Sequence, residues 1–171
     1  MTDPQITLTP WHPHHLLALI ESEAAFAESF GLPAAKGLRE FMVGGEASAD
    51  WLAALRASST PSPFEHGFAV TQVGGGEVIG MLAFKGLPDD RGVVEIAYGI
   101  VPGCEGQGLA TAAAGAGTTF AFADERVRCV RAHTLPEVNA STRVLQKNGF
   151  VKLGEVIDPE DGRVWRWERE S

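Results

Sequence analysis

The chain has few cysteines and few basic residues, and each shortage narrows the possible functions. Cys104 and Cys129 are the only thiols, and their spacing fits no metal-binding or redox motif, so we expect a reduced, cytoplasmic location. Lysine and arginine number 14 against 22 aspartates and glutamates, which gives a formal net charge of −8. Because a nucleic-acid-binding surface needs clustered basic residues, we expect no nucleic-acid partner. The negative charge is compatible with cationic amine substrates.

Long hydrophobic runs are also missing. The apolar stretches are far shorter than the ~20 residues that span a bilayer, and the polar start MTDPQ does not resemble a signal peptide. We therefore expect no membrane partner. Apolar residues make up 44% of the chain and charged residues 21%, which is typical of a globular protein. A length of 171 residues favours one domain over residues 1–171.

Hydrophobic periodicity predicts an alternating order of strands and helices, and hence an α/β (α+β) fold. Strands are predicted from β-branched runs and from apolar alternation, and helices from apolar residues at helical spacing. The predicted strands cover residues 6–9, 67–73, 78–84, 93–100, 127–133, 151–157 and 164–168. The predicted helices cover residues 14–30, 33–41, 49–57, 109–124 and 139–148.

A glycine-spaced turn joins the fourth predicted strand to a long helix, within the sequence IVPGCEGQGLAT of residues 100–111. Gly106 and Gly108 remove the Cβ clash that would keep the backbone N–H groups of the turn from converging. Unpaired N–H groups and the positive end of the helix dipole favour a phosphate or pyrophosphate at such a place. The turn therefore indicates a phosphate cradle, although a plain strand-to-helix turn would show the same two glycines.

Two familiar phosphate loops do not fit this turn. A P-loop needs a Gly-Lys-Ser/Thr run, and the chain has none. The dinucleotide fingerprint needs three glycines, whereas the run from Gly106 to Thr111 supplies two. A dinucleotide-binding oxidoreductase is therefore a distant alternative.

The turn and several ordered segments resemble the GNAT N-acetyltransferases, and in particular the RimJ/RimL-like enzymes. EGQGLA is similar to the coenzyme A loop Q/R-x-x-G-x-G/A at every fixed position except the first. EIAYGIVP resembles the fourth strand of these enzymes, and AFADERVRCVRAHT resembles the end of their third helix and their fifth strand. NASTRVLQKNGF resembles their fourth helix and its Gly-Phe corner. The resemblance is weakest between residues 21 and 60.

This resemblance implies both a fold and an activity. The implied GNAT fold has a mixed, mostly antiparallel sheet of about seven strands, flanked by about four helices, with a V-shaped splay between strands four and five. The implied activity is acetyl-CoA-dependent transfer of an acetyl group to a primary amine of a protein N-terminus or small molecule. A monomer or homodimer without a metal is expected. The alternative is a non-catalytic acyl-CoA-binding module, which departures from the family pattern at Glu105, Leu145 and Asn139 motivate.

The resemblance also implies the contacts to acetyl-CoA. The backbone at Ile100 and Val101 is expected to pair with the pantetheine arm like an extra strand. The turn is expected to bind the pyrophosphate through Glu105, Gly106, Gln107, Gly108, Leu109, Ala110 and Thr111. Glu105 replaces the usual Gln or Arg, and we expect its side chain to point into solvent. Asn139 lies one residue beyond the family's position and is expected to contact the cofactor or to cap the helix.

Glu95 and Ser141 are the candidate catalytic residues. Glu95 shares a strand face with Ala97 and Gly99, whose small size leaves room for an amine or for a water that relays its proton. A salt-bridged structural glutamate is the alternative. Ser141 matches the serine of the family's N-x-A-S pattern and could donate a hydrogen bond to the departing sulfur, or could bond only its own helix backbone.

Three other positions bear on the chemistry of the site. Many GNAT enzymes place an acidic tyrosine four residues before the corner glycine, but this position is Leu145. His133, at the end of a predicted strand, is a second base candidate, with a structural role preferred. His12, His14 and His15 lie too close in sequence to converge on a tetrahedral ion, so we predict no metal site and place them near the acceptor cleft.

Overall fold

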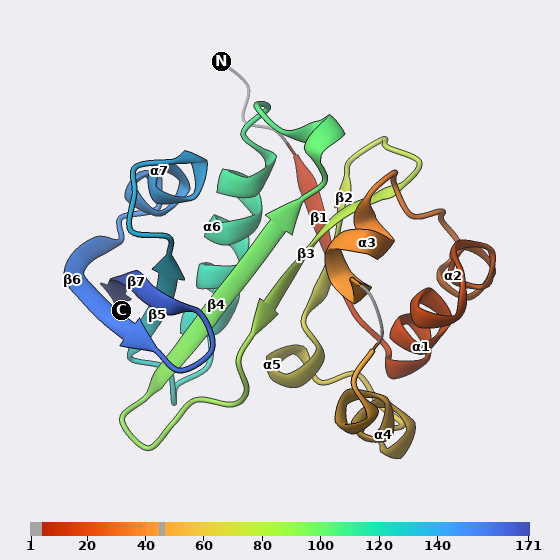
Figure 1. Ribbon diagram of the computed structural model, residues 1–171, viewed down its shortest axis with the longest axis horizontal. Coiled ribbons are helices and arrows are strands. Elements are labelled where there is room, and N and C mark those ends of the chain that lie inside the picture. Colours follow the sequence, from red (N-terminus) through yellow and green to blue (C-terminus); the bar gives the residue numbers. More distant parts are fainter. Residues whose placement is uncertain (1–4, 45–46) are drawn as a thin grey trace.

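The computed structural model describes residues 5–44 and 47–171, so most of the polar start lies outside the described residues. Figure 1 shows one sheet with helices on both sides. The strands are β1 (Ile6–Pro10), β2 (Phe68–Gln72), β3 (Val78–Phe84), β4 (Val93–Ile100), β5 (Cys129–Thr134), β6 (Val151–Asp158) and β7 (Gly162–Glu170). The helices are α1 (Pro13–Glu21), α2 (Glu23–Phe30), α3 (Leu38–Val43), α4 (Ala49–Ala57), α5 (Pro63–His66), α6 (Leu109–Phe122) and α7 (Ala140–Lys147), with a 3₁₀ turn at Pro102–Cys104. None of these helices, within the described ranges, is long and apolar enough to cross a membrane.

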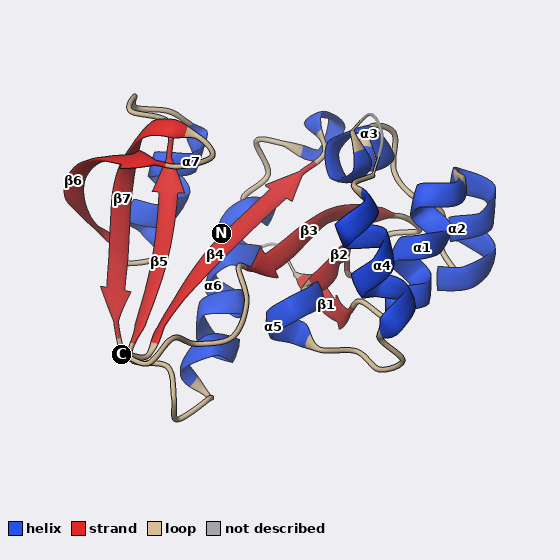
Figure 2. Ribbon diagram, turned by 60° about the horizontal axis from the view of Figure 1, so that its bottom comes forward, coloured by secondary structure: helices blue, strands red, loops and turns tan. Residues whose placement is uncertain are grey.

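The seven strands are ordered β1-β2-β3-β4-β5-β7-β6, and β4 with β5 is the one parallel pair in the described sheet. Their pairing covers only Val93 to Glu95 against Cys129 to Arg131. Beyond these residues the two strands diverge, as Figure 2 shows. The structure therefore confirms the predicted fold class, including the splay between the fourth and fifth strands.

Helix α6 lies behind β4 in Figure 1 and contacts β4, β3 and β1. Its many small residues allow this close approach. A Cβ atom at Gly117 would lie 2.4 Å from Cδ1 of Leu82, so a larger residue there would push the helix off the sheet. On β4, Val94, Ile96 and Ile100 are buried and alternate with less buried positions, as predicted for one face of a strand. This packing fixes the end of β4 relative to the start of α6.

The structure has more helices than the resemblance implied, because local caps divide the first half of the chain. The predicted helix over residues 14–30 is two helices, since Ser22 closes α1 and its hydroxyl accepts a 3.0 Å hydrogen bond from the Ala25 N–H to begin α2. The predicted helix over residues 33–41 begins only at Leu38, after Gly37 with φ of 93°. By contrast, α4, β3 and β4 have the predicted bounds.

The three neighbouring histidines lie at the start of α1. The side chain of His12 accepts a 3.2 Å hydrogen bond from the His14 N–H, and Nδ1 of His15 accepts one of 3.2 Å from the His12 N–H. The two imidazoles thus form a reciprocal cap. No group of three histidine, cysteine, aspartate or glutamate residues in the described ranges could hold a metal ion.

His15 predicts a loss of stability in mild acid. Burial, with repulsion from His14 and His12, lowers the pKa of His15 to about 4 from an ordinary value of 6.5. Between these two values the unfolded chain binds a proton that the folded chain does not, so the free energy of unfolding falls as pH falls. His15→Gln keeps an acceptor for the cap, and we expect thermal unfolding of this variant to depend less on pH between 6.5 and 4. Equal pH dependence in both proteins would contradict this assignment.

Candidate active site

A cleft of about 740 Å³ lies between the end of β4, the glycine turn and α7. At this point β4 and β5 have diverged, so β5 does not fill the space beside Tyr98 to Ile100. The predicted residues that line it are Ile100, Glu105, Gly106, Gly108, Leu109, Ala110, Thr111 and Ser141. Four other predicted residues, Val101, Gln107, Asn139 and Glu95, are not part of its wall.

The glycine turn has the geometry that an anion cradle needs. Gly106 and Gly108 have φ of 76° and 75°, in the left-handed region that favours glycine. Within the part of the chain that the structure describes, the backbone N–H groups of residues 106–111 donate to no acceptor. A Cβ atom at Gly106 would have no heavy atom within 4 Å, so the turn leaves space above its backbone. These N–H groups at the start of a 14-residue helix suit a pyrophosphate.

Helix α7 forms the opposite wall of the cleft. Ser141, Val144 and Lys147 lie on one helix face at spacings of three, together with Ala140 and Arg143. The cations of Arg143 and Lys147 suit phosphate groups. Asn148 holds this wall to the turn, because its Nδ2 donates to the carbonyl of Thr111 at 3.1 Å and to that of Val144 at 3.0 Å.

The backbone at the end of β4 is only partly available to a ligand. The Val101 N–H donates to the Ile79 carbonyl at 2.9 Å, and the Val101 carbonyl accepts from the Cys104 N–H at 3.0 Å. Ile100 lies opposite Gly80 on β3, between the bonded positions, so its own N–H and carbonyl point toward the splay. The structure therefore favours Ile100 over Val101 for pairing with an extended ligand.

Glu105 is exposed at the cleft rim, as expected for a carboxylate that points into solvent. Asn139 is the N-cap of α7, and its Oδ1 accepts a 3.0 Å hydrogen bond from the Thr142 N–H. The Thr142 hydroxyl oxygen in turn accepts a 3.0 Å hydrogen bond from the Asn139 N–H. The capping role is thus present in the structure, whereas a contact between Asn139 and the cofactor stays a prediction.

Two substitutions separate the possible roles of Asn139. Asn139→Ala removes the cap acceptor and is expected to cost about 1 kcal/mol of stability, measured as a fall of roughly 2–4 °C in Tm. Asn139→Ser keeps a cap acceptor and should restore most of this loss. If the serine variant is stable yet binds acetyl-CoA as tightly as the parent, Asn139 acts only as a cap. A stable serine variant with weakened binding would assign it a cofactor contact.

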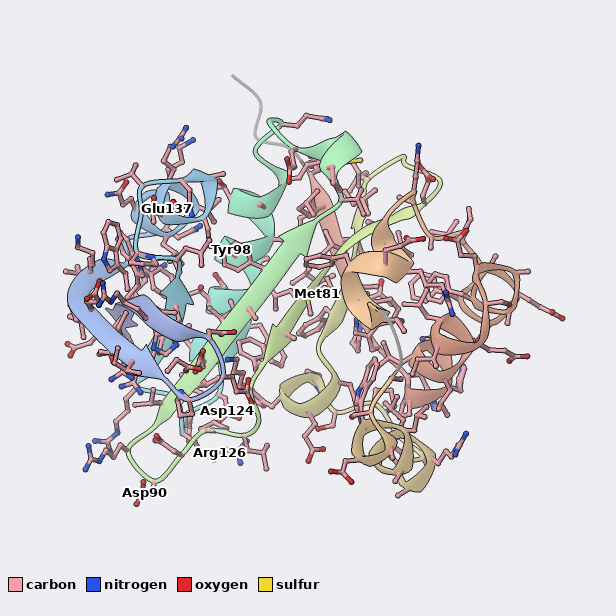
Figure 3. All side chains as sticks on the ribbon, viewed as in Figure 1. Met81, Asp90, Tyr98, Asp124, Arg126 and Glu137 are labelled. Atoms are coloured by element: carbon pink, nitrogen blue, oxygen red, sulfur yellow. The ribbon has the colours of Figure 1, made fainter. Side chains whose placement is uncertain are left out.

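Ser141 lies opposite the only tyrosine of the chain. The hydroxyl of Tyr98 is 3.3 Å from Oγ of Ser141 and 3.4 Å from its carbonyl oxygen, and Figure 3 shows Tyr98 between β4 and α7. Burial raises the pKa of Tyr98, and the hydrogen bond to Ser141 lowers it by less. Leu145, at the family's usual tyrosine position, is completely buried in the core and reaches no part of the cleft wall.

Glu95 lies on the other face of β4, in a charged cluster. Its Oε1 is 3.2 Å from Nζ of Lys85 and 2.8 Å from Nδ1 of His133, and 21% of its side chain is exposed. Its Oε2 has no hydrogen-bond partner among the described residues. Partial burial acts to lower the pKa of Lys85, but the hydrogen bond and ion pair with Glu95 raise it overall. Oε1 of Glu95 is therefore bonded to Lys85 and His133, whereas Oε2 is free to accept a proton.

His133 is held between two partners. Nε of Arg166 donates to Nε2 of His133 at 3.1 Å, and since an arginine can only donate, Nε2 accepts. Nδ1 then carries the proton that His133 donates to Glu95. With both ring nitrogens engaged, His133 orients Glu95, and the structure favours Glu95 over His133 as the base.

Phe41 is a part of the site that the sequence did not indicate. A Cβ atom at Gly99 would lie 2.1 Å from the Phe41 ring, so α3 places this half-exposed ring directly on the Glu95 face of β4. Phe41 belongs to the poorly matched segment, where no motif marked it. Arg143 and Lys147 could have been found from their helical spacing to Ser141, and Tyr98 from the need of a buried hydroxyl for a partner.

Comparison with known families decides the assignment. The family model described as acetyltransferase (GNAT) domain matches residues 5–151. The chain belongs to the GNAT acetyltransferase family. This membership confirms the predicted class of enzyme, an acetyl-CoA-dependent N-acetyltransferase, and its cosubstrate. A search of curated protein sequences finds no match.

Solved structures of other acetyltransferases have the same fold. RimJ of Mycobacterium smegmatis, in complex with CoA-disulfide, is 20% identical over 97% of this chain and 82% of its own, with a TM-score of 0.65. The ribosomal-protein-S5-alanine acetyltransferase of Vibrio fischeri is 13% identical over 99% and 95%, with a TM-score of 0.66. The aminoglycoside acetyltransferase AAC(6')-Ib, in complex with coenzyme A, is 22% identical over 97% and 95%, with a TM-score of 0.64.

Proposed function

We propose that residues 1–171 form one catalytic domain of this GNAT enzyme, in which Glu95 accepts the amine proton and Ser141 donates a hydrogen bond to the departing sulfur. The observation that carries this proposal is the cleft itself. Its floor is the glycine turn with unbonded N–H groups, and its far wall presents Ser141. A pyrophosphate at the turn would direct the thioester end of acetyl-CoA along β4 toward Ser141.

Each part of acetyl-CoA has matching residues. The N–H groups of residues 106–111 and the cations of Arg143 and Lys147 suit the phosphates. The backbone of Ile100 faces the splay, where the pantetheine amides would extend the sheet. The Thr111 hydroxyl lies in the first turn of α6, within reach of the same cradle.

The acceptor amine is proposed to approach over the Glu95 face of β4, beside Ala97 and under Phe41. Because Glu95 does not line the cleft, its Oε2 takes the proton through an intervening water. The amine nitrogen forms a bond to the thioester carbonyl carbon, the carbon–sulfur bond breaks, and its electron pair leaves with the sulfur. Holding the amine and the thioester together supplies much of the rate in this direct transfer.

The proposed acceptor is an α-amine of a protein N-terminus or a small molecule. An α-amine with a pKa near ~8 costs about 1.4 kcal/mol to deprotonate at pH 7, whereas a lysine amine near ~10.4 costs roughly 4.6 kcal/mol. A solvent-accessible carboxylate is a modest base, so the lower cost suits Glu95. Two of the enzymes with the same fold are named for the acetylation of a ribosomal-protein alanine and of aminoglycosides, and both kinds of acceptor carry an amine.

Paired peptides test this acceptor class. One peptide has a free N-terminus and no lysine, and the other has a blocked N-terminus and one lysine. We expect a higher kcat/KM for the α-amine at pH 7 and a smaller difference at pH 9, where the α-amine is already neutral. Preference for the lysine peptide at pH 7 would overturn the acceptor class while leaving acetyl transfer in place.

A further inference from the structure

The cleft contains one hydroxyl pair that the proposed mechanism uses only in part. Tyr98 and Ser141 face each other from β4 and α7, with 3.3 Å between their hydroxyl oxygens. Both residues line the cleft, and the departing sulfur must lie within it. The family's usual tyrosine position is the buried Leu145, and Tyr98 is the only tyrosine in the chain. No other phenol can therefore serve as an acid.

We propose that Tyr98 is the proton source for the departing thiolate and that Ser141 relays its proton. This inference rests on the proposed function, because it requires Ser141 to face the sulfur. When the carbon–sulfur bond breaks, the sulfur keeps the electron pair and takes the proton of the Ser141 hydroxyl, which gives free CoA thiol. Ser141 takes the proton of Tyr98 at the same time. The phenolate of Tyr98 then regains a proton from water, and Glu95 loses to water the proton that it took from the amine.

The acidities of the three groups set which hydroxyl can supply the proton. A serine hydroxyl alone is a much weaker acid than a thiol, so Ser141 without a donor behind it would protonate the sulfur poorly. The phenol of tyrosine, with an ordinary pKa of about 10, is a weaker acid than a thiol at about 8.5, so the transfer is mildly uphill, but far less so than transfer from serine alone. Because burial raises the pKa of Tyr98, the phenol keeps its proton at neutral pH.

The position of Tyr98 also agrees with a catalytic role. Its neighbours on the same face of β4, Ile96 and Ile100, are buried apolar residues. The hydroxyl of Tyr98 is therefore the polar group on an otherwise apolar stretch of this face. The pairing of β4 with β5 ends at Glu95, three residues earlier. The phenol lines the cleft beyond this pairing, and its hydroxyl lies within hydrogen-bond distance of Ser141 on α7.

Steady-state rates of four proteins test the relay: the parent, Tyr98→Phe, Ser141→Ala and the double variant. We expect each single variant to lower kcat by about 10²-fold, with little change in the Kd of acetyl-CoA. Because the two hydroxyls act in series, the double variant should be no slower than the slower single variant. Ser62→Ala, which removes a hydroxyl without a capping bond outside the cleft, is the control and should have parental kcat.

The thiol pKa of bound CoA provides a readout independent of turnover. It is measured from thiolate absorbance, with desulfo-CoA as the blank so that protein groups cancel. A relay that donates to the sulfur stabilises the thiolate, so Tyr98→Phe and Ser141→Ala should each raise this pKa by about one unit. Cys104, Glu105, Arg143 and Lys147 are the other titratable residues of the cleft wall, and both variants leave them in place.

The outcomes separate this inference from the proposed function. A Tyr98→Phe enzyme with kcat within twofold of the parent, or with an unchanged thiol pKa, would overturn the relay even if Ser141→Ala is slow. If the fold-decrease in kcat of the double variant equals the product of the two single fold-decreases, the hydroxyls act separately. This result would also overturn the relay. If the parent protein transfers no acetyl group, the proposed function fails, and the thiol pKa still decides whether Tyr98 acts on the sulfur.

Discussion

Replacement of Glu95 by glutamine is expected to lower kcat by ~10² to 10⁴, the range for loss of a general base, with little change in the affinity for acetyl-CoA. Glutamine keeps the size of the side chain and an oxygen for Lys85 and His133, but cannot take a proton. Initial rates, with acetyl-CoA Kd from tryptophan quenching, measure both effects.

Glu168 offers a matched control for Glu95. It lies on β7 in the same sheet, its side chain is 20% exposed, and its Oε1 is 2.6 Å from an arginine nitrogen of Arg131. Glu168→Gln therefore weakens a comparable ion pair outside the cleft and should leave kcat near the parental value. If both variants lose stability and neither loses turnover, Glu95 is a structural salt-bridge residue and the base lies elsewhere.

Gly108→Val is expected to weaken acetyl-CoA binding at least tenfold, which corresponds to about 1.4 kcal/mol. Gly108 has φ of 75°, a conformation that a β-branched residue adopts only with strain. Valine would therefore move the backbone N–H groups of the turn and fill space that the pyrophosphate needs. Isothermal titration measures the affinity, and circular dichroism checks that the fold is intact.

Gly74→Val separates strain from ligand contact. Gly74 has φ of 78° in the turn between β2 and β3, and a Cβ atom there would meet nothing within 4 Å. This variant has similar backbone strain away from the cleft, so it should lose stability but keep its affinity for acetyl-CoA. Equal affinities of the Gly108→Val variant and the parent would remove the pyrophosphate assignment.

Local sequence signals predicted the elements that position the cofactor site. The bounds of β3, β4 and α4 agree with the periodicity, and Gly106 and Gly108 lie in a strand-to-helix turn with positive φ, where the missing Cβ matters. These features depend on neighbouring residues along the chain. The cap at Ser22 was not recognised, because a serine within an apolar helical pattern is also tolerated in a continuous helix.

The acceptor side of the site depends on contacts between distant segments, which periodicity does not report. Phe41 reaches Gly99 through the packing of α3 on β3. Lys85 reaches Glu95 from the residue after β3, and His133 reaches it from β5. The sequence placed Glu95 on the fourth strand, but its contacts with Lys85 and His133 join segments that are distant along the chain. The catalytic roles of Glu95 and Ser141 remain predictions for the variants above.

Release of free CoA thiol from acetyl-CoA, followed with and without a primary amine, tests the central claim most directly. The account predicts thiol release that depends on the amine, with one acetylated amine formed for each thiol released. Mass spectrometry of the acceptor counts the acetyl groups. A protein that binds acetyl-CoA but releases no thiol with α-amine peptides, lysine peptides or small amines would contradict the account and indicate a non-catalytic acyl-CoA-binding module.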